Sequence, residues 1–188
     1  MTDIVATRLN LFRNDCGLRA HSKLIRQLQV LQTRIDEGIP RWREAFNDHS
    51  DPARRWVLET TTLRLDFECY IEILSRFFRL CRDVTGIEEI SKEPIVQKIR
   101  LARNRIIEHG YDVDREGDRG FFCGDGGPKL VSDQHPTDCP AFGELQKEVG
   151  LVLRKYCLRE QEFQVRFNAI RGTQIWTDQD DRAIPDWL

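Results

Sequence analysis

The chain of 188 residues has the length of one typical domain, and its 40% hydrophobic residues are enough to build one core. Charged residues make up 32% of the sequence but nearly cancel to a formal net charge of -2, which disfavours a dedicated duplex-DNA-binding protein. No apolar stretch reaches the length of a membrane span and no signal sequence is recognisable, so we expect one cytoplasmic domain, residues 1–188, with no membrane partner.

The six cysteines are widely spaced along the chain and include no Cys-x-x-Cys pair. Zinc sites and small disulfide scaffolds both depend on close, regular spacings. No glycine-rich phosphate loop precedes a predicted helix either. The sequence therefore predicts neither a metal site nor a cofactor.

The first predicted helix spans residues 18–37. Its apolar residues recur at steps of three and four, which places them on one face: Leu24, Leu28, Leu31 and Ile35. Gly38, followed by Ile39 and Pro40, is expected to end this helix. A short helical piece over residues 42–46 is expected to follow.

The second predicted helix is the clearest. Asp51 can cap free amides and Pro52 fits the first helical position, while Gly86 is expected to end the helix. Between them, one apolar stripe runs through Leu63, Phe67, Tyr70, Leu74, Phe77, Cys81 and Val84. A helix of this length, about 50 Å at 1.5 Å per residue, needs long neighbours to cover the stripe.

The third predicted helix spans residues 93–109 and ends at Gly110. The residues expected to face the core are Ile95, Ile99, Ala102 and Ile106. Its start is open between Ser91, which can cap, and Pro94, which stands where a capping-box glutamate would be.

Residues 112–137 lose the helical period and are rich in glycine, which predicts an irregular loop insertion with a short hairpin around Asp125-Gly126. A fourth long helix is predicted from residues 137–140 to Ile170, and residues 173–188 form an acidic tail. Together these elements predict an all-α fold, an antiparallel bundle of four to five helices with one long loop between the third and fourth.

The end of the third helix concentrates polar chemistry. Taken alone, a histidine in the last turn is ordinary, because the helix dipole favours a positive charge there. Arg43 and His49 stand at the same spacing as Arg103 and His109, so the spacing alone is not informative. The informative feature is the contiguous string Arg103-Asn104-Arg105-Ile106-Ile107-Glu108-His109-Gly110-Tyr111-Asp112-Val113-Asp114.

This string resembles the R-x(4-6)-H signature of HEPN domains, and most closely that of HEPN toxins paired with minimal nucleotidyltransferase antitoxins, in which it continues as His-x-Tyr. Those toxins have four residues between the arginine and the histidine, whereas this chain has five, which turns His109 by about a further 100° around the helix axis. The resemblance implies a helical bundle, a homodimer that brings two copies of the signature together, and RNA cleavage without metal.

The resemblance also implies roles for individual residues. Histidine titrates near neutral pH, so His109 would move the proton of the attacking 2′-hydroxyl. Arg103 would stabilise charge on the phosphate, Asn104 would orient Arg103 or the phosphate, and Glu108 would tune His109. The residues implied to contact RNA are Lys98, Arg100, Arg105 and Tyr111.

Each of these residues also has a structural interpretation. Arg103 and Asn104 would solvate a bundle face, His109 would stabilise the helix end, Tyr111 would pack at the start of the loop, and Glu108 would face solvent. Two further groups are interpreted as structural, namely a solvated basic edge, Arg76, Arg79 and Arg82, and a row of aromatic residues in the core or at a dimer interface, Phe67, Tyr70, Phe77 and Phe78.

Two functions follow from the sequence. The first is a HEPN-like, metal-independent endoribonuclease of toxin or defence type, acting as a homodimer, with an RNA substrate and a nucleotidyltransferase-type antitoxin as its partners. The alternative is a non-catalytic helical interaction or scaffold protein with a dimerisation surface. Composition fits both.

Overall fold

The computed structural model describes residues 16–47, 62–109, 121–124, 127–130 and 141–173. Within this part of the chain the elements follow in the order α2 (Cys16–Asn47), α4 (Arg64–Thr85), η2 (Glu88–Lys92), α5 (Pro94–His109), β1 (Phe121–Gly124), β2 (Gly127–Leu130), α6 (Phe142–Lys155) and α7 (Glu160–Thr173). The fold is an all-α helical bundle to which one small hairpin is added, and the predicted fold class is confirmed.

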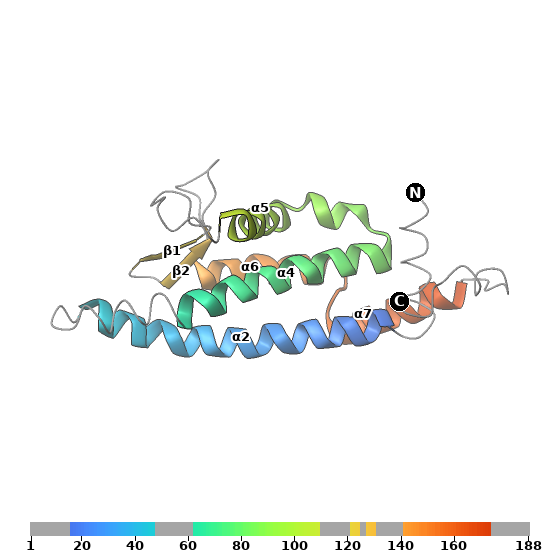
Figure 1. Ribbon diagram of the computed structural model, residues 1–188. Helices are drawn as coiled ribbons and strands as arrows, with labels where there is room; N and C mark the ends of the chain where they lie inside the picture. Colours follow the sequence, from blue (N-terminus) through green and yellow to red (C-terminus); the bar gives the residue numbers. More distant parts are fainter. Residues whose placement is uncertain (1–15, 48–61, 110–120, 125–126, 131–140, 174–188) are drawn as a thin grey trace.

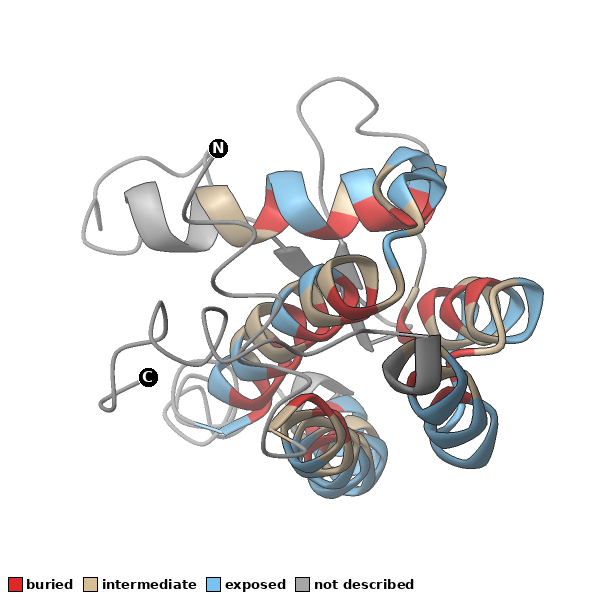
Figure 2. Cartoon of the chain, turned by 90° about the vertical axis from the view of Figure 1, so that its right-hand side faces the viewer, coloured by how far each residue is buried: buried red, intermediate tan, exposed pale blue. Residues whose placement is uncertain are grey.

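Helix α4 is the centre of the bundle. It packs along α2 on one side and along α5 on the other, with α6 behind it (Figure 1). Buried residues lie on the faces that the helices turn toward one another, and exposed residues lie on the outside (Figure 2). The apolar stripe predicted for this helix is confirmed, because all seven of its residues, Leu63, Phe67, Tyr70, Leu74, Phe77, Cys81 and Val84, are buried.

The predicted end of α4 is also confirmed. Gly86 adopts the left-handed conformation, with φ 71°, and its amide donates a hydrogen bond of 2.8 Å to the carbonyl oxygen of Arg82. Such a φ is strained for residues that carry a Cβ atom, which is why glycine suits this position. The start predicted at Asp51 and Pro52 lies outside the described residues.

The predicted end of the first helix at Gly38 is wrong, because α2 continues through Pro40 to Asn47 and includes the separate piece predicted at residues 42–46. Beyond the proline, Trp42 is only 1% exposed. Burying 150–250 Å² of an aromatic side chain contributes about 4 to 6 kcal/mol, more than the roughly 3 kcal/mol that a proline costs inside a helix. Tertiary burial thus outweighs the local break signal.

Gly38 has a packing role in α2. A Cβ atom placed there would lie 3.1 Å from Cδ1 of Leu63, which is tighter than an ordinary contact. The glycine therefore allows the buried Leu63 side chain to approach the α2 backbone closely.

The third helix begins at Pro94, so the open choice at its start is settled in favour of the proline. Before it, Glu88–Lys92 form a 3-10 helix that the sequence did not predict. Ile95, Ile99 and Ala102 are buried, as expected. The side chain of Ile106 and all of Gly110 lie outside what the structure describes.

The predicted hairpin is confirmed. Strands β1 and β2 pair antiparallel, with Phe121 opposite Leu130 and Gly124 opposite Gly127, so the connection falls at residues 125–126 as expected. The rest of the predicted loop insertion, residues 112–120 and 131–137, is not described. Of the predicted tail 173–188, only Thr173, the last residue of α7, is described.

The prediction of one fourth helix that reaches Ile170 is wrong, because the helix is interrupted between α6 and α7. Cys157 has a φ of 53°, and the buried Leu158 donates its amide to the carbonyl oxygen of Leu153 at 2.8 Å. The break redirects the chain so that Phe163 and Phe167 of α7 are buried. An unbroken helix would have continued along the line of α6.

His21 of α2 holds this break in place. Its Nε2 atom lies 2.9 Å from the carbonyl oxygen of Leu158, and its ring stacks on that of Phe163 with a centroid distance of 3.8 Å and an interplanar angle of 4°. Burial lowers the pKa of this histidine below its ordinary value, in spite of the hydrogen bond to Leu158 and the nearby charge of Glu160, which raise it.

Candidate nucleic-acid interface

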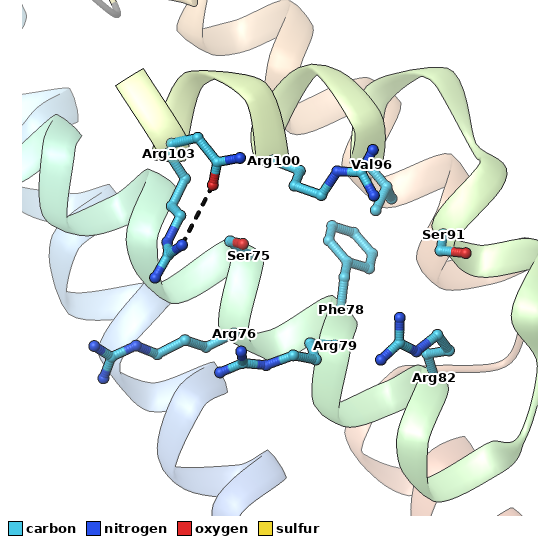
Figure 3. A pocket seen from close by; sticks show the side chains of 10 residues that line it. Ser75, Arg76, Phe78, Arg79, Arg82, Ser91, Val96, Arg100 and Arg103 are labelled. Atoms are coloured by element: carbon cyan, nitrogen blue, oxygen red, sulfur yellow. Dashed lines mark hydrogen bonds between the residues drawn. The ribbon is translucent and has the colours of Figure 1, made fainter. Parts of the chain in front are cut away.

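A pocket of about 190 Å³ lies between α4 and α5 (Figure 3). Its floor includes Phe78 of α4 and Val96 of α5, both of which are buried. The polar residues that line it are Ser75, Arg76, Arg79, Arg82, Ser91, Arg100, Arg103 and Asn104. We call this pocket the arginine groove.

The arginines of the groove come from two helices. Arg76, Arg79 and Arg82 follow one another at three-residue steps along α4, and Arg100 and Arg103 stand three residues apart on α5. Residues three apart are neighbours on a helix surface, so each set forms a row beside the buried face of its own helix. Because α4 and α5 pack against each other, the two rows line the same pocket.

Glu72 connects the two rows at one end of the groove. Its Oε2 atom accepts a hydrogen bond of 2.9 Å from Nε of Arg103, and its Oε1 atom accepts one of 2.8 Å from Nε of Arg76. Partial burial raises the pKa of Glu72, but the hydrogen bonds and charges of Arg103 and Arg76 outweigh it and lower the pKa below its ordinary value. The carboxylate is therefore ionised at neutral pH.

The charge of the groove is only partly neutralised. Arg82 pairs with Asp83 at 2.7 Å, whereas Arg79 and Arg100 have no ion pair among the side chains that the structure describes. The lining residues include no aspartate or glutamate. The five arginines thus carry more positive charge than the two carboxylates paired with them, Glu72 and Asp83, can neutralise. The groove therefore attracts anions.

Three of the predicted site residues lie together in this groove. Arg103, Asn104 and Arg100 all line it, and Nη1 of Arg103 donates to Oδ1 of Asn104 at 3.3 Å, so the amide contacts the guanidinium that it was expected to orient. The side chain of Arg103 is 34% exposed. A ligand in the groove can therefore reach it.

The structure does not show any of the remaining predicted site residues to line the groove. Lys98 lies on α5 but does not line the pocket. Arg105, Glu108 and His109 belong to the last turns of α5, although their side chains lie outside what is described, as does all of Tyr111. The position of the His109 imidazole relative to Arg103 stays a prediction.

Sequence reasoning missed the α4 half of the site. The sequence alone favours a solvated edge for Arg76, Arg79 and Arg82, and it assigns no role to Glu72. The signal available in the sequence was the regular three-residue step of the arginines beside an aromatic stripe. That pattern does not say which neighbouring helix the row faces, and only packing against α5 makes it part of a pocket.

The aromatic row is confirmed as core. Phe67, Tyr70, Phe77 and Phe78 are all buried, and Phe78 is only 2% exposed even though it lies at the groove. A stacking platform needs an open aromatic face. The groove therefore offers charge and hydrogen bonds in place of a surface for bases.

The described residues contain no group of three or more histidine, cysteine, aspartate or glutamate side chains placed to hold a metal ion. None of the described helices is both long enough and apolar enough to cross a bilayer. Comparison of the chain with family models, with curated proteins and with solved structures finds no significant match in any of the three.

Proposed function

We propose that this protein is a HEPN-like helical bundle that binds RNA at the arginine groove and cleaves it without a metal ion. One observation carries the proposal. Arg103 and Asn104, the first residues of the HEPN-like string, line a pocket that receives three further arginines from α4. A phosphodiester is the ligand that such a set of guanidinium groups fits best.

The proposed reaction uses the RNA's own 2′-hydroxyl. The 2′-oxygen attacks the adjacent phosphorus, the bond from phosphorus to the 5′-oxygen breaks, and the products are a cyclic phosphate and a free 5′-hydroxyl. His109 removes the 2′-proton as general base, and the departing 5′-oxygen takes up a proton from water. The guanidinium of Arg103 donates to the phosphate oxygens as negative charge develops on them, and Asn104 holds that guanidinium in place.

The contacts of Glu72 favour a second function, in which the protein binds RNA or a partner protein but does not cleave RNA. Its carboxylate already occupies Nε of Arg103 and carries a compensating charge. If that ion pair persists when a ligand is bound, Arg103 holds a phosphate but stabilises a reacting one poorly. This is the non-catalytic alternative, with the same groove as its binding surface.

RNA cleavage in EDTA separates the two functions. We expect wild-type protein to cleave a mixed-sequence RNA, and His109→Ala to lower the rate by at least about a hundredfold, since general acid-base catalysis contributes about 10² to 10⁴. Arg103→Gln should lower it by about 10². The matched control is His49→Ala, which removes the histidine of the equally spaced Arg43 and His49 pair and should leave the rate unchanged.

The result decides between the functions. Equal cleavage by wild type and His109→Ala would show a contaminating nuclease and end the endoribonuclease proposal. Binding that depends on the groove, in the absence of cleavage of a transcriptome-wide RNA mixture, would favour the non-catalytic function.

The partners are proposals of the same kind. A homodimer that brings two α5 ends together and a nucleotidyltransferase-type antitoxin that blocks the groove both follow from the resemblance. Sedimentation equilibrium tests the first. Restoration of growth by a gene neighbouring the coding sequence, in cells that express this protein, tests the second.

A further inference from the structure

The arginine groove extends well beyond the residues of the HEPN-like string. Arg103 and Arg76 lie at one end, and Arg82 and Ser91 lie at the other (Figure 3). From Arg76 to Arg82 the α4 row covers about 9 Å along the helix axis, at 1.5 Å per residue. Successive phosphates of one extended strand lie farther apart than the 3.4 Å axial rise of a stacked duplex, so this length spans no more than about two phosphates.

The shape of the groove limits what enters it. Its volume of about 190 Å³ is well below the roughly 300 to 1,000 Å³ of pockets that enclose whole small-molecule ligands. A phosphodiester group fits this space. The floor residues Phe78 and Val96 are buried and offer no face on which a base could stack.

The two rows of arginines also favour one strand over two. Arg79 on α4 and Arg100 on α5 line the same small pocket from opposite helices, and neither has an ion pair among the described side chains. A single backbone can be contacted from both sides in this way. In an A-form RNA duplex each backbone is attached to stacked base pairs and borders a deep, narrow major groove and a wide, shallow minor groove, so it cannot lie between two rows of arginines in the same way.

We infer that the arginine groove is a backbone track for single-stranded RNA, which holds about two nucleotides on one side of the cleavage position through their phosphates and without sequence preference. The inference rests on the proposed function for the nature of the strand. It adds the substrate class, the place of the flanking strand, and the two arginines, Arg79 and Arg100, that hold it.

The test is the salt dependence of binding, measured by fluorescence anisotropy with labelled 12-nucleotide RNAs. Each phosphate contact with a single strand contributes about 0.7 to the slope of log Kd against log salt. We expect Arg79→Gln and Arg100→Gln each to reduce the slope by about 0.7 and to weaken binding to oligo-U and oligo-A by the same factor. The matched control, Arg41→Gln, changes an exposed arginine of α2, on the opposite side of α4 from α5, and should change neither (Figure 1).

The outcomes separate this inference from the proposed function. If the groove variants lower affinity as expected while neither wild type nor any variant cleaves RNA, the track stands and the endoribonuclease proposal fails. If wild type cleaves RNA but Arg79→Gln and Arg100→Gln keep the wild-type slope and Kd, the track is wrong and the proposal survives. Binding of a 12-base-pair RNA duplex as tightly as the single strand, or unequal losses on oligo-U and oligo-A, would also overturn the track.

Discussion

Glu72 gives the sharpest prediction, because its carboxylate competes with a phosphate for the same guanidinium groups. It accepts hydrogen bonds from Arg103 at 2.9 Å and from Arg76 at 2.8 Å, at one end of the arginine groove. Replacing it by glutamine removes one negative charge, keeps the size of the side chain and leaves an amide oxygen as acceptor. The variant Glu72→Gln therefore tests charge separately from shape.

We expect Glu72→Gln to bind single-stranded RNA more tightly. At a charge separation on the order of 6 Å and the dielectric constant of water, removing one repulsion between carboxylate and phosphate is worth about 0.7 kcal/mol, or roughly a threefold decrease in Kd. The salt slope should steepen by up to about 0.7, because Arg103 becomes free to take a phosphate. Anisotropy titrations between about 50 and 200 mM salt measure both quantities.

The same substitution should change stability little at neutral pH. The side chains of Arg103 and Glu72 are 34% and 22% exposed, and ion pairs of this kind contribute about 0 to 1 kcal/mol. Because the arginines lower the pKa of the folded carboxyl, its contribution is complete above the ordinary value of 4.5 and is lost as the pH falls below it. Urea unfolding at pH 7 and at pH 4 should therefore show a small gap between wild type and variant that narrows at the lower pH.

Either of two results would refute the reasoning about Glu72. If Glu72→Gln bound RNA several-fold more weakly, the carboxylate would be needed to hold Arg103 and Arg76 in their binding positions. If the variant and wild type had the same Kd and slope, Arg103 would not contact the phosphate backbone. A groove variant that keeps Glu72, such as Arg79→Gln, is the control for loss of charge elsewhere in the pocket.

Three further predictions concern the fold. Burial lowers the pKa of His21, so the free energy of unfolding of the wild type should be highest above pH 6.5 and should decrease as the pH falls below it. Urea unfolding at pH 7.5 and 5.5 should show a smaller decrease for His21→Phe. Gly150→Ala should raise the free energy of unfolding by about 0.5 to 1 kcal/mol, since a Cβ there meets nothing within 4 Å. Gly38→Ala should gain less or be destabilised, because its Cβ would press against the Leu63 side chain. Equal gains for the two variants in thermal melts would contradict this. Pro40→Ala should stabilise α2 by about 1 to 3 kcal/mol, and an unchanged Tm would show that the helix already accommodates the ring.

The sequence predicted best the elements whose pattern is regular and whose end signals are not overridden by packing. In α4, seven apolar residues repeat on one face and all are buried, and Gly86 ends the helix as expected. The hairpin was predictable because a two-residue connection containing glycine is a local signal. These features depend on near neighbours in sequence, which a single sequence displays directly.

The two errors have a common cause in long-range packing. The glycine and proline of α2 do not end the helix, because Leu63 packs against Gly38 and Trp42 is buried beyond Pro40. The break between α6 and α7 has no proline or glycine to announce it. It is fixed by the contact of the Leu158 carbonyl oxygen with His21, which lies 137 positions away in the chain.

The candidate site shows the same division. Arg103 and Asn104 could be found from the string at the end of α5, because a local motif carries them, and Arg100 could be found as a positive charge on the same helix. The α4 arginines could not be assigned to a site, since nothing in their own segment says that α5 packs beside them. The sequence thus predicted one wall of the groove, and the packing of α4 against α5 supplies the other.

The α4 row is better explained by a ligand than by stability. Like charges three residues apart on a helix repel, and each such pair costs about 0.2 to 0.5 kcal/mol, so a helix surface shaped by stability alone would alternate its charges as Arg64 and Glu68 do at the start of α4. Glu72 and Asp83 neutralise the two ends of the row, while Arg79 in the middle has no ion pair among the described side chains. Arg100 of α5 lines the same pocket and increases the repulsion. A bound phosphate backbone would neutralise these central arginines, which is why the charge measured by the salt slope should be concentrated at Arg79 and Arg100.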